Sequence, residues 1–136
     1  MAFTYHCTVR LADTDAAGVV YFAKVLPMCH EAYEESLEAA GINLSNLVDN
    51  SSTDIPIVHA EVDFFRPMFW GDKLLIEVIP RQLKESEFEV IYSIFSKAKL
   101  DKKVAQALTR HVCIQREMRI RTALPQLVNN WIVTHS

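Results

Sequence analysis

The chain has 136 residues, of which half are hydrophobic and only three are glycine, so it has the composition of one compact domain, 1–136, and not of a disordered segment. The formal net charge is −3, no apolar run of about 18 residues is present, and the N-terminus lacks a secretion-signal pattern, so we expect no membrane span and no nucleic-acid partner. Three widely separated cysteines predict reduced thiols in a cytoplasmic protein.

The first half of the chain predicts a strand followed by a long helix. Phe3–Leu11 has a composition rich in β-forming residues. Apolar residues then recur every three or four positions over Leu26–Ala40, which is helical spacing. Pro27 is tolerated only in a first turn and Gly41 favours a stop, so both ends of this helix are predicted.

The second half of the chain is rich in β-forming residues after a polar segment, 43–54, that predicts a loop or a short helix with a loop. Four strands are expected, at Ile55–Phe65, Lys73–Leu83, Glu87–Ser96 and Lys103–Glu117. Turns at Lys84–Ser86 and Leu100–Lys102 predict that the last three form an antiparallel meander. With a final short helix at Leu124–Trp131, the pattern predicts an α+β domain in which a five-stranded, mostly antiparallel sheet wraps one long helix.

The segment Asp13-Thr14-Asp15-Ala16-Ala17-Gly18-Val19-Val20-Tyr21-Phe22 places two acids and a glycine between the strand and the helix. An aspartate there is often a helix cap or a turn former. However, Pro27 puts the regular helix about ten residues after Asp15, and Gly18 permits a left-handed backbone. A carboxylate held beside the free N–H groups that open a helix also suits hydrolysis of an acyl group.

This segment resembles the active-site signature of hotdog-fold acyl-CoA thioesterases of the 4-hydroxybenzoyl-CoA thioesterase type, which reads Asp-x-Asp-x-x-Gly-x-Val-x-Phe/Tyr before a long helix. The resemblance continues over His59–Leu74 and covers most of the chain. The run Phe64-Phe65-Arg66-Pro67-Met68 is most similar to the branch that hydrolyses 1,4-dihydroxy-2-naphthoyl-CoA in phylloquinone or menaquinone synthesis. The resemblance implies a hotdog fold and a homo-oligomer, either a dimer or a tetramer made of two dimers, in which the strand Ile57–Asp63 pairs with its twin.

The resemblance also implies roles for single residues. Asp15 is the expected catalytic carboxylate, as nucleophile or general base, with Asp13 and Gly18 in support. The oxyanion contact is expected from the backbone N–H of Phe22. Relatives often carry tyrosine at that position, whereas here Tyr21 precedes it and remains a candidate substrate contact.

Further candidate contacts lie outside this motif. His59 is a candidate substrate contact, although a lone histidine on a strand is more often a core or interface residue. Residues 97–121 hold eight basic side chains against two acidic ones, so an anionic ligand would prefer this region. Candidates for the CoA phosphates are Lys102, Lys103, Arg110 and Arg116, and the alternative is that these cations only keep a sheet soluble.

The leading hypothesis is therefore a thioesterase acting on an aromatic acyl-CoA. No histidine or cysteine has metal-ligand spacing, so we expect no metal, and CoA is part of the substrate and not a retained cofactor. The alternatives are a broad aliphatic or benzoyl acyl-CoA thioesterase and a non-catalytic acyl-CoA binding module. A dehydratase is disfavoured, since that chemistry needs a histidine base and the 13–22 segment has none.

Overall fold

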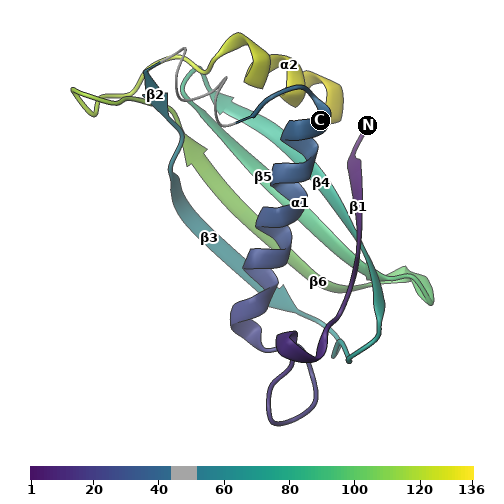
Figure 1. Cartoon of the computed structure of the whole chain (residues 1–136). Coiled ribbons are helices and arrows are strands. Elements are labelled where there is room, and N and C mark those ends of the chain that lie inside the picture. The colour runs from purple at the N-terminus through teal and green to yellow at the C-terminus, as the bar shows by residue number, and fades with distance from the viewer. Residues whose placement is uncertain (44–51) are drawn as a thin grey trace.

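The computed structural model describes residues 1–43 and 52–136, and in it one long helix, α1 (Val25–Ala39), lies against a five-stranded sheet (Figure 1). The strands lie in the order β1 (Phe3–Thr8), β4 (Lys73–Lys84), β5 (Glu87–Ser96), β6 (Lys99–Val112) and β3 (Ile57–Phe64), and all neighbours are antiparallel. The predicted α+β architecture and its antiparallel meander are confirmed.

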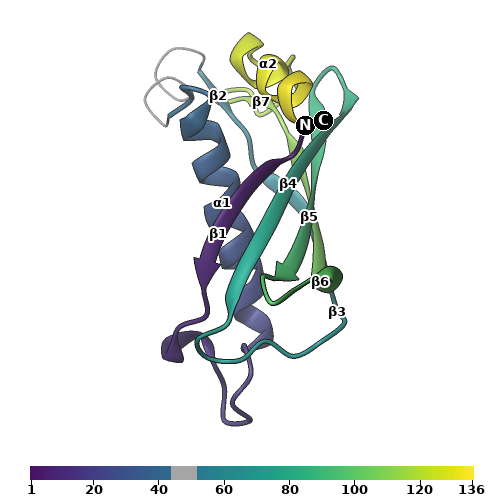
Figure 2. The ribbon, with the colours of Figure 1, turned by 90° about the vertical axis from the view of Figure 1, so that its right-hand side faces the viewer.

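Smaller elements complete the described part of the chain. Two single-turn 3₁₀ helices, η1 (Leu11–Asp13) and η2 (Phe22–Lys24), precede α1, and a second sheet pairs β2 (Thr53–Asp54) with β7 (Ile114–Gln115). The C-terminal helix α2 (Gln126–His135) lies beside the C-terminal end of α1 (Figure 2). None of the helices in these residues combines the length and the apolar character needed to cross a membrane.

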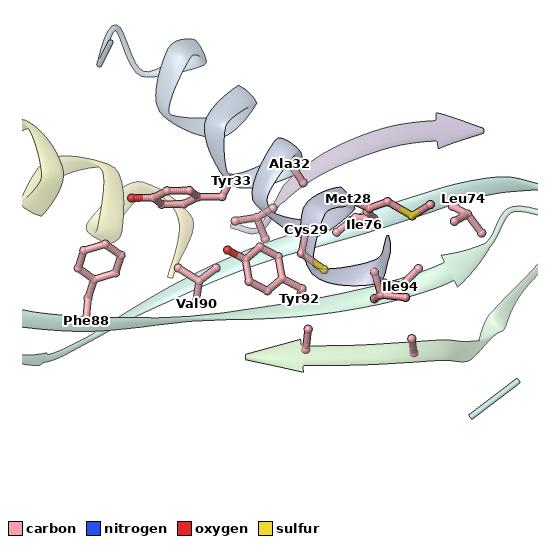
Figure 3. Packing of buried hydrophobic residues seen from close by; sticks show 14 of the residues in the cluster. Met28, Cys29, Ala32, Tyr33, Leu74, Ile76, Phe88, Val90, Tyr92 and Ile94 are labelled. Atoms are coloured by element: carbon pink, nitrogen blue, oxygen red, sulfur yellow. The ribbon is translucent and has the colours of Figure 1, made fainter. Parts of the chain in front are cut away.

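The core lies between α1 and the sheet (Figure 3). Val25, Cys29 and Ala32 of α1 are fully buried, as are the inward-facing residues of β4 and β5, namely Leu74, Ile76, Val78, Phe88, Val90, Tyr92 and Ile94. At the other end of α1, the buried Trp131 of α2 donates a hydrogen bond from Nε1 to Ser36 Oγ over 3.2 Å. Each buried aliphatic or aromatic side chain contributes about 1.5–3 kcal/mol, so this face of α1 holds the fold together.

Two predicted boundaries are wrong at the end of the sheet that lies near residue 15. The first strand ends at Thr8 and not at Leu11, because Asp13 Oδ2 accepts the Arg10 N–H over 2.8 Å and closes η1. The turn expected at Leu100–Lys102 is formed by residues 97 and 98, and β6 already begins at Lys99. Asp101 favours a turn locally, but pairing of Lys99 with Ser96 keeps the segment in the strand.

Other boundaries differ at the opposite end of the sheet. The strand expected over Lys103–Glu117 stops at Val112, because Cys113 turns to donate its N–H to Ser86 O and the chain continues as β7 in the small sheet. The last helix begins after Pro125 and runs to His135. Most of the polar segment 43–54 lies outside the described residues.

One histidine lies inside the aromatic part of this core. His111 is 1% exposed, stacks on Phe88 with ring centroids 4.6 Å apart, and shares a hydrogen bond of 2.8 Å between Nε2 and Thr109 Oγ1. Its Nδ1 is buried without a hydrogen-bond partner among the described residues. Burial, with a smaller contribution from nearby His30, lowers the pKa of His111 from 6.5 to about 4.

This histidine predicts a loss of stability in acid. Between pH 6.5 and pH 4 the unfolded chain binds a proton at His111 that the folded chain does not, so the free energy of unfolding should fall by up to about 3 kcal/mol as the pH drops through that window. Chemical denaturation at several pH values measures this. His111→Gln, which keeps a polar group near Thr109 but cannot titrate, should show a shallower fall. An equally steep fall in this variant would contradict the assignment.

Candidate functional site

Asp15 opens a tight turn that projects from the end of the sheet. Its N–H donates to Val19 O over 2.9 Å, and Gly18 donates its N–H to Asp15 O over 3.0 Å with φ at +84°. That left-handed conformation favours glycine. Asp15 Oδ1 accepts the N–H of Ala17 over 2.9 Å, while Oδ2 has no hydrogen-bond partner in residues 1–43 and 52–136. The carboxylate is thus oriented by its own turn and open to solvent on one side.

Asp13 has a different position from Asp15. Its carboxylate caps η1, and its carbonyl oxygen accepts the N–H of Tyr21 over 2.8 Å. This last bond brings the beginning of the helical segment back against the start of the Asp15 turn. The backbone at Asp13 is helical, so Asp13 and Asp15 do not lie together on an extended strand, where alternate side chains would share a face.

The helical segment begins with N–H groups that face no acceptor. Tyr21 is extended, η2 starts at Phe22, and it continues directly into α1 at Val25. Lys24 donates to Tyr21 O, but the N–H groups of Phe22 and Ala23 have no partner within the described parts of the chain. The first N–H groups of a helix carry partial positive charge and can receive a developing anion. The rings of Tyr21 and Phe22 meet edge to face at 4.9 Å, and both are exposed.

A second segment, residues 65–72, supports the Asp15 turn. Val20 donates its N–H to Met68 O over 2.8 Å, and Val19 forms a β-bridge with Phe69. Gly71 donates its N–H to Val9 O over 2.9 Å. The turn is therefore held from both sides by backbone hydrogen bonds.

A cavity of about 280 Å³ lies where these two segments meet. It is lined by Val19, Val20, Phe64, Phe65, Arg66, Pro67 and Met68. Arg66 supplies its only cation and is absent from the ion pairs found among the described residues. Arg66 entered the sequence analysis only as part of the run that carries the resemblance, although a cation next to an aromatic run is a signal for a site residue.

The predicted phosphate-binding cations are split between two ends of β6. Lys102 and Lys103 lie at the end near the Asp15 turn, because the neighbouring Val104 O accepts the N–H groups of both Phe65 and Arg66. Arg110 lies eight residues beyond Lys102, or roughly 26 Å along a strand. A single chain therefore does not bring these cations together.

The more distant cations have carboxylate partners. Arg110 Nε lies 3.7 Å from Glu87 Oε1, and Arg116 Nε lies 3.1 Å from Asp54 Oδ1. His59, on β3, lies beside Arg110, with its Nε2 3.3 Å from Glu61 Oε1. His59 does not line the cavity beside Arg66, nor either of two further cavities found among the described residues.

A cavity of larger volume lies beside the first turns of α1, beyond Phe22. Its volume is about 390 Å³, and it lies between the first turns of α1 and strands β3 and β6, with Leu26, Pro27, His30, Ile57, Ala60 and Thr109 as its lining. We call it the α1–β3 slot. None of these residues was singled out from the sequence as a site residue, because the slot is formed by segments that are far apart along the chain.

The cysteines are not suited to act as nucleophiles. Burial raises the pKa of Cys7 to about 11 and that of Cys29 to about 12, so both thiols are protonated at neutral pH. Asp15 is the exposed carboxylate that lies closest along the chain to the free N–H group of Phe22.

Comparisons with known proteins identify the family of the chain. A family model described as the thioesterase-like superfamily matches residues 9–132. A 1,4-dihydroxy-2-naphthoyl-CoA hydrolase of Gloeothece citriformis is 57% identical, with 94% of this chain and 90% of that protein covered. A hydrolase of the same name from Nostoc punctiforme is 54% identical over 99% of this chain and 89% of that protein.

A solved structure gives the same result for the fold. The crystal structure of a 1,4-dihydroxy-2-naphthoyl-CoA thioesterase from Synechocystis is 41% identical, with a TM-score of 0.92 and coverage of 98% of this chain and 96% of that one. The hotdog fold expected from the resemblance is confirmed.

Proposed function

Because the chain belongs to the thioesterase-like superfamily, we propose that it hydrolyses an aromatic acyl-CoA thioester, with 1,4-dihydroxy-2-naphthoyl-CoA as the favoured substrate. The products are 1,4-dihydroxy-2-naphthoate and CoA, which makes the reaction a step of phylloquinone or menaquinone synthesis in the cytoplasm. The observation that carries the proposal is the open carboxylate of Asp15 in a turn that is closed by the hydrogen bond from the Tyr21 N–H to Asp13 O, just before the helical segment begins. The named activity of relatives 57% and 54% identical supports the choice of acyl group.

The proposed chemistry uses two groups, the N–H of Phe22 and the carboxylate of Asp15. The thioester carbonyl oxygen accepts the N–H of Phe22, and this N–H stabilises the negative charge that develops on the oxygen when the carbonyl carbon is attacked. Asp15 either adds to that carbon directly, giving a mixed anhydride that water then cleaves, or removes a proton from the attacking water. In both routes the C–S bond breaks and the CoA thiolate leaves. A thiolate is a good leaving group, so the reaction requires no metal ion.

Replacing the carboxylate tests this mechanism. Asp15→Asn keeps the shape and the Ala17 contact but removes the charge, so kcat should fall by roughly 100- to 10,000-fold. Asp13→Asn is the matched control, because an amide oxygen can still accept the Arg10 N–H. That variant should lose much less activity. Steady-state hydrolysis of the naphthoyl thioester, with circular dichroism to verify folding, measures both. Turnover by Asp15→Asn close to that of the wild type would rule out the mechanism.

The proposed oligomer rests on the exposed edge of β3. This strand pairs with β6 on one side, and no strand among the described residues pairs with its other side. Ile57, Val58 and Phe64 are 41–54% exposed, which is unusual for apolar residues on an edge strand. A second copy that adds its own β3 about a two-fold axis would pair this edge and cover these side chains.

The same two-fold axis would complete the site. Antiparallel pairing of the two β3 strands sets the Phe64 end of one protomer, beside the Asp15 turn, against the Ile57 end of its partner. Arg116 lies at the Ile57 end, since it is bonded to Asp54 of β2. Each Asp15 would then work with Lys102 and Lys103 of its own chain and with the arginines of the partner, which brings together the cations that a single chain separates.

Mixing two defective variants tests the shared site. Arg116→Gln should raise KM with little change in kcat, the pattern of lost substrate binding. When this variant and Asp15→Asn are unfolded together and refolded, each hybrid dimer has one intact site, so activity at low substrate should recover to about a quarter of that of the wild type. Separately refolded variants are the control. A fully active monomer in light scattering, or no recovery on mixing, would contradict the shared site.

A further inference from the structure

The α1–β3 slot begins one helical turn beyond the proposed oxyanion contact. Leu26 and Pro27 lie four and five residues after Phe22, and His30 lies eight residues after it. At about 1.5 Å per residue, the slot therefore extends from about 6 to about 12 Å along α1 from the Phe22 N–H. Figure 1 shows β3 alongside this part of the helix. An acyl group whose carbonyl oxygen is bound at Phe22 would run into the slot.

The walls of the slot favour a flat apolar group. Leu26, Pro27, Ile57 and Ala60 present only hydrocarbon side chains. Thr109 also lines it, but its hydroxyl is already bonded to Tyr92 Oη at 3.2 Å and to His111 Nε2 at 2.8 Å. Tyr92 lies on β5, across β6 from β3, and His111 lies two residues along β6, so these two partners already engage the hydroxyl of Thr109. His30 is then the one polar side chain in the lining for which the described residues show no hydrogen-bond partner.

The slot exists because one inward-facing position of β3 is small. The register pairs Ala60 with Thr109, Val62 with Ala107 and Phe64 with Ala105 across β3 and β6. Val62 packs against the core, and Phe64 is larger still. A side chain of that size at position 60 would occupy the space that is now open. The volume of about 390 Å³ suits one ring system and not a whole CoA thioester.

We infer that Ala60, with Thr109 behind it, sets the size of the acyl group that the enzyme accepts, so that this position allows a bicyclic ring. The inference rests on the proposed function and adds a specificity-determining residue to it. Hydrogen bonds to Tyr92 and His111 hold Thr109 in place. In this proposal they fix one wall of the slot, so that the slot does not close around a smaller acyl group.

Substitution at Ala60 tests the inference. Ala60→Leu fills the slot, so the ratio of kcat/KM for 1,4-dihydroxy-2-naphthoyl-CoA to that for benzoyl-CoA should fall by roughly tenfold or more. Glu61→Leu is the matched control, because it puts the same bulk on the opposite face of the same strand and should leave the ratio within about twofold. Ala60→Val, a smaller change suited to a strand, should shift the ratio in the same direction if Ala60→Leu does not fold.

The outcomes separate this inference from the proposed function. An unchanged ratio in a folded Ala60→Leu or Ala60→Val enzyme that still hydrolyses thioesters would overturn the slot and leave the thioesterase assignment intact. An equal shift in Glu61→Leu would show that disturbance of β3, and not filling of the slot, changes the ratio, and would also overturn it. A wild-type protein that hydrolyses no thioester would overturn both.

Discussion

Packing of α1 into the curved face of the sheet is the constraint on which the rest of the structure depends. Val25, Cys29 and Ala32 have no accessible surface, and they share one core cluster with inward-facing residues of β4 and β5 that are equally buried. Figure 3 shows Cys29 and Ala32 among these residues. The helix cannot slide along the sheet without exposing several of these side chains, at about 1.5–3 kcal/mol each. Its position, and therefore the position of its first N–H groups, is set by the core.

The candidate site takes its geometry from that fixed helix start. Tyr21 is bonded to Asp13 and Val20 to Met68, so two separate segments hold the turn that carries Asp15. These are backbone hydrogen bonds, which do not depend on side-chain rotamers. A carboxylate and an N–H group held in this way need little rearrangement when charge develops on a bound carbonyl, which is the condition for electrostatic stabilisation of a transition state.

The features to which we assign functional roles lie where the packing of a single chain is incomplete. The edge of β3 has no strand beyond it among the described residues, and small side chains in facing positions of β3 and β6 leave the α1–β3 slot between sheet and helix. Both features lie on the same strand, so a partner copy at the edge would also border the slot. The candidate phosphate-binding cations also depend on a partner copy. A two-fold arrangement would bring Lys103 of one copy near Arg116 of the other, whereas the two lie far apart in a single chain.

The sequence by itself determined the features that depend on neighbouring residues. Helical spacing with Pro27 and Gly41 predicted α1 to within one residue at each end, and β5 lies where Glu87–Ser96 was expected. The spacing of Asp15 and Gly18 predicted a special turn. Tertiary structure alone decided the support of the Asp15 turn by Met68, the end of β6 at Val112 and the role proposed for Ala60. The reason is physical: these depend on hydrogen bonds and small facing side chains contributed by segments far apart in the chain, which no local pattern records.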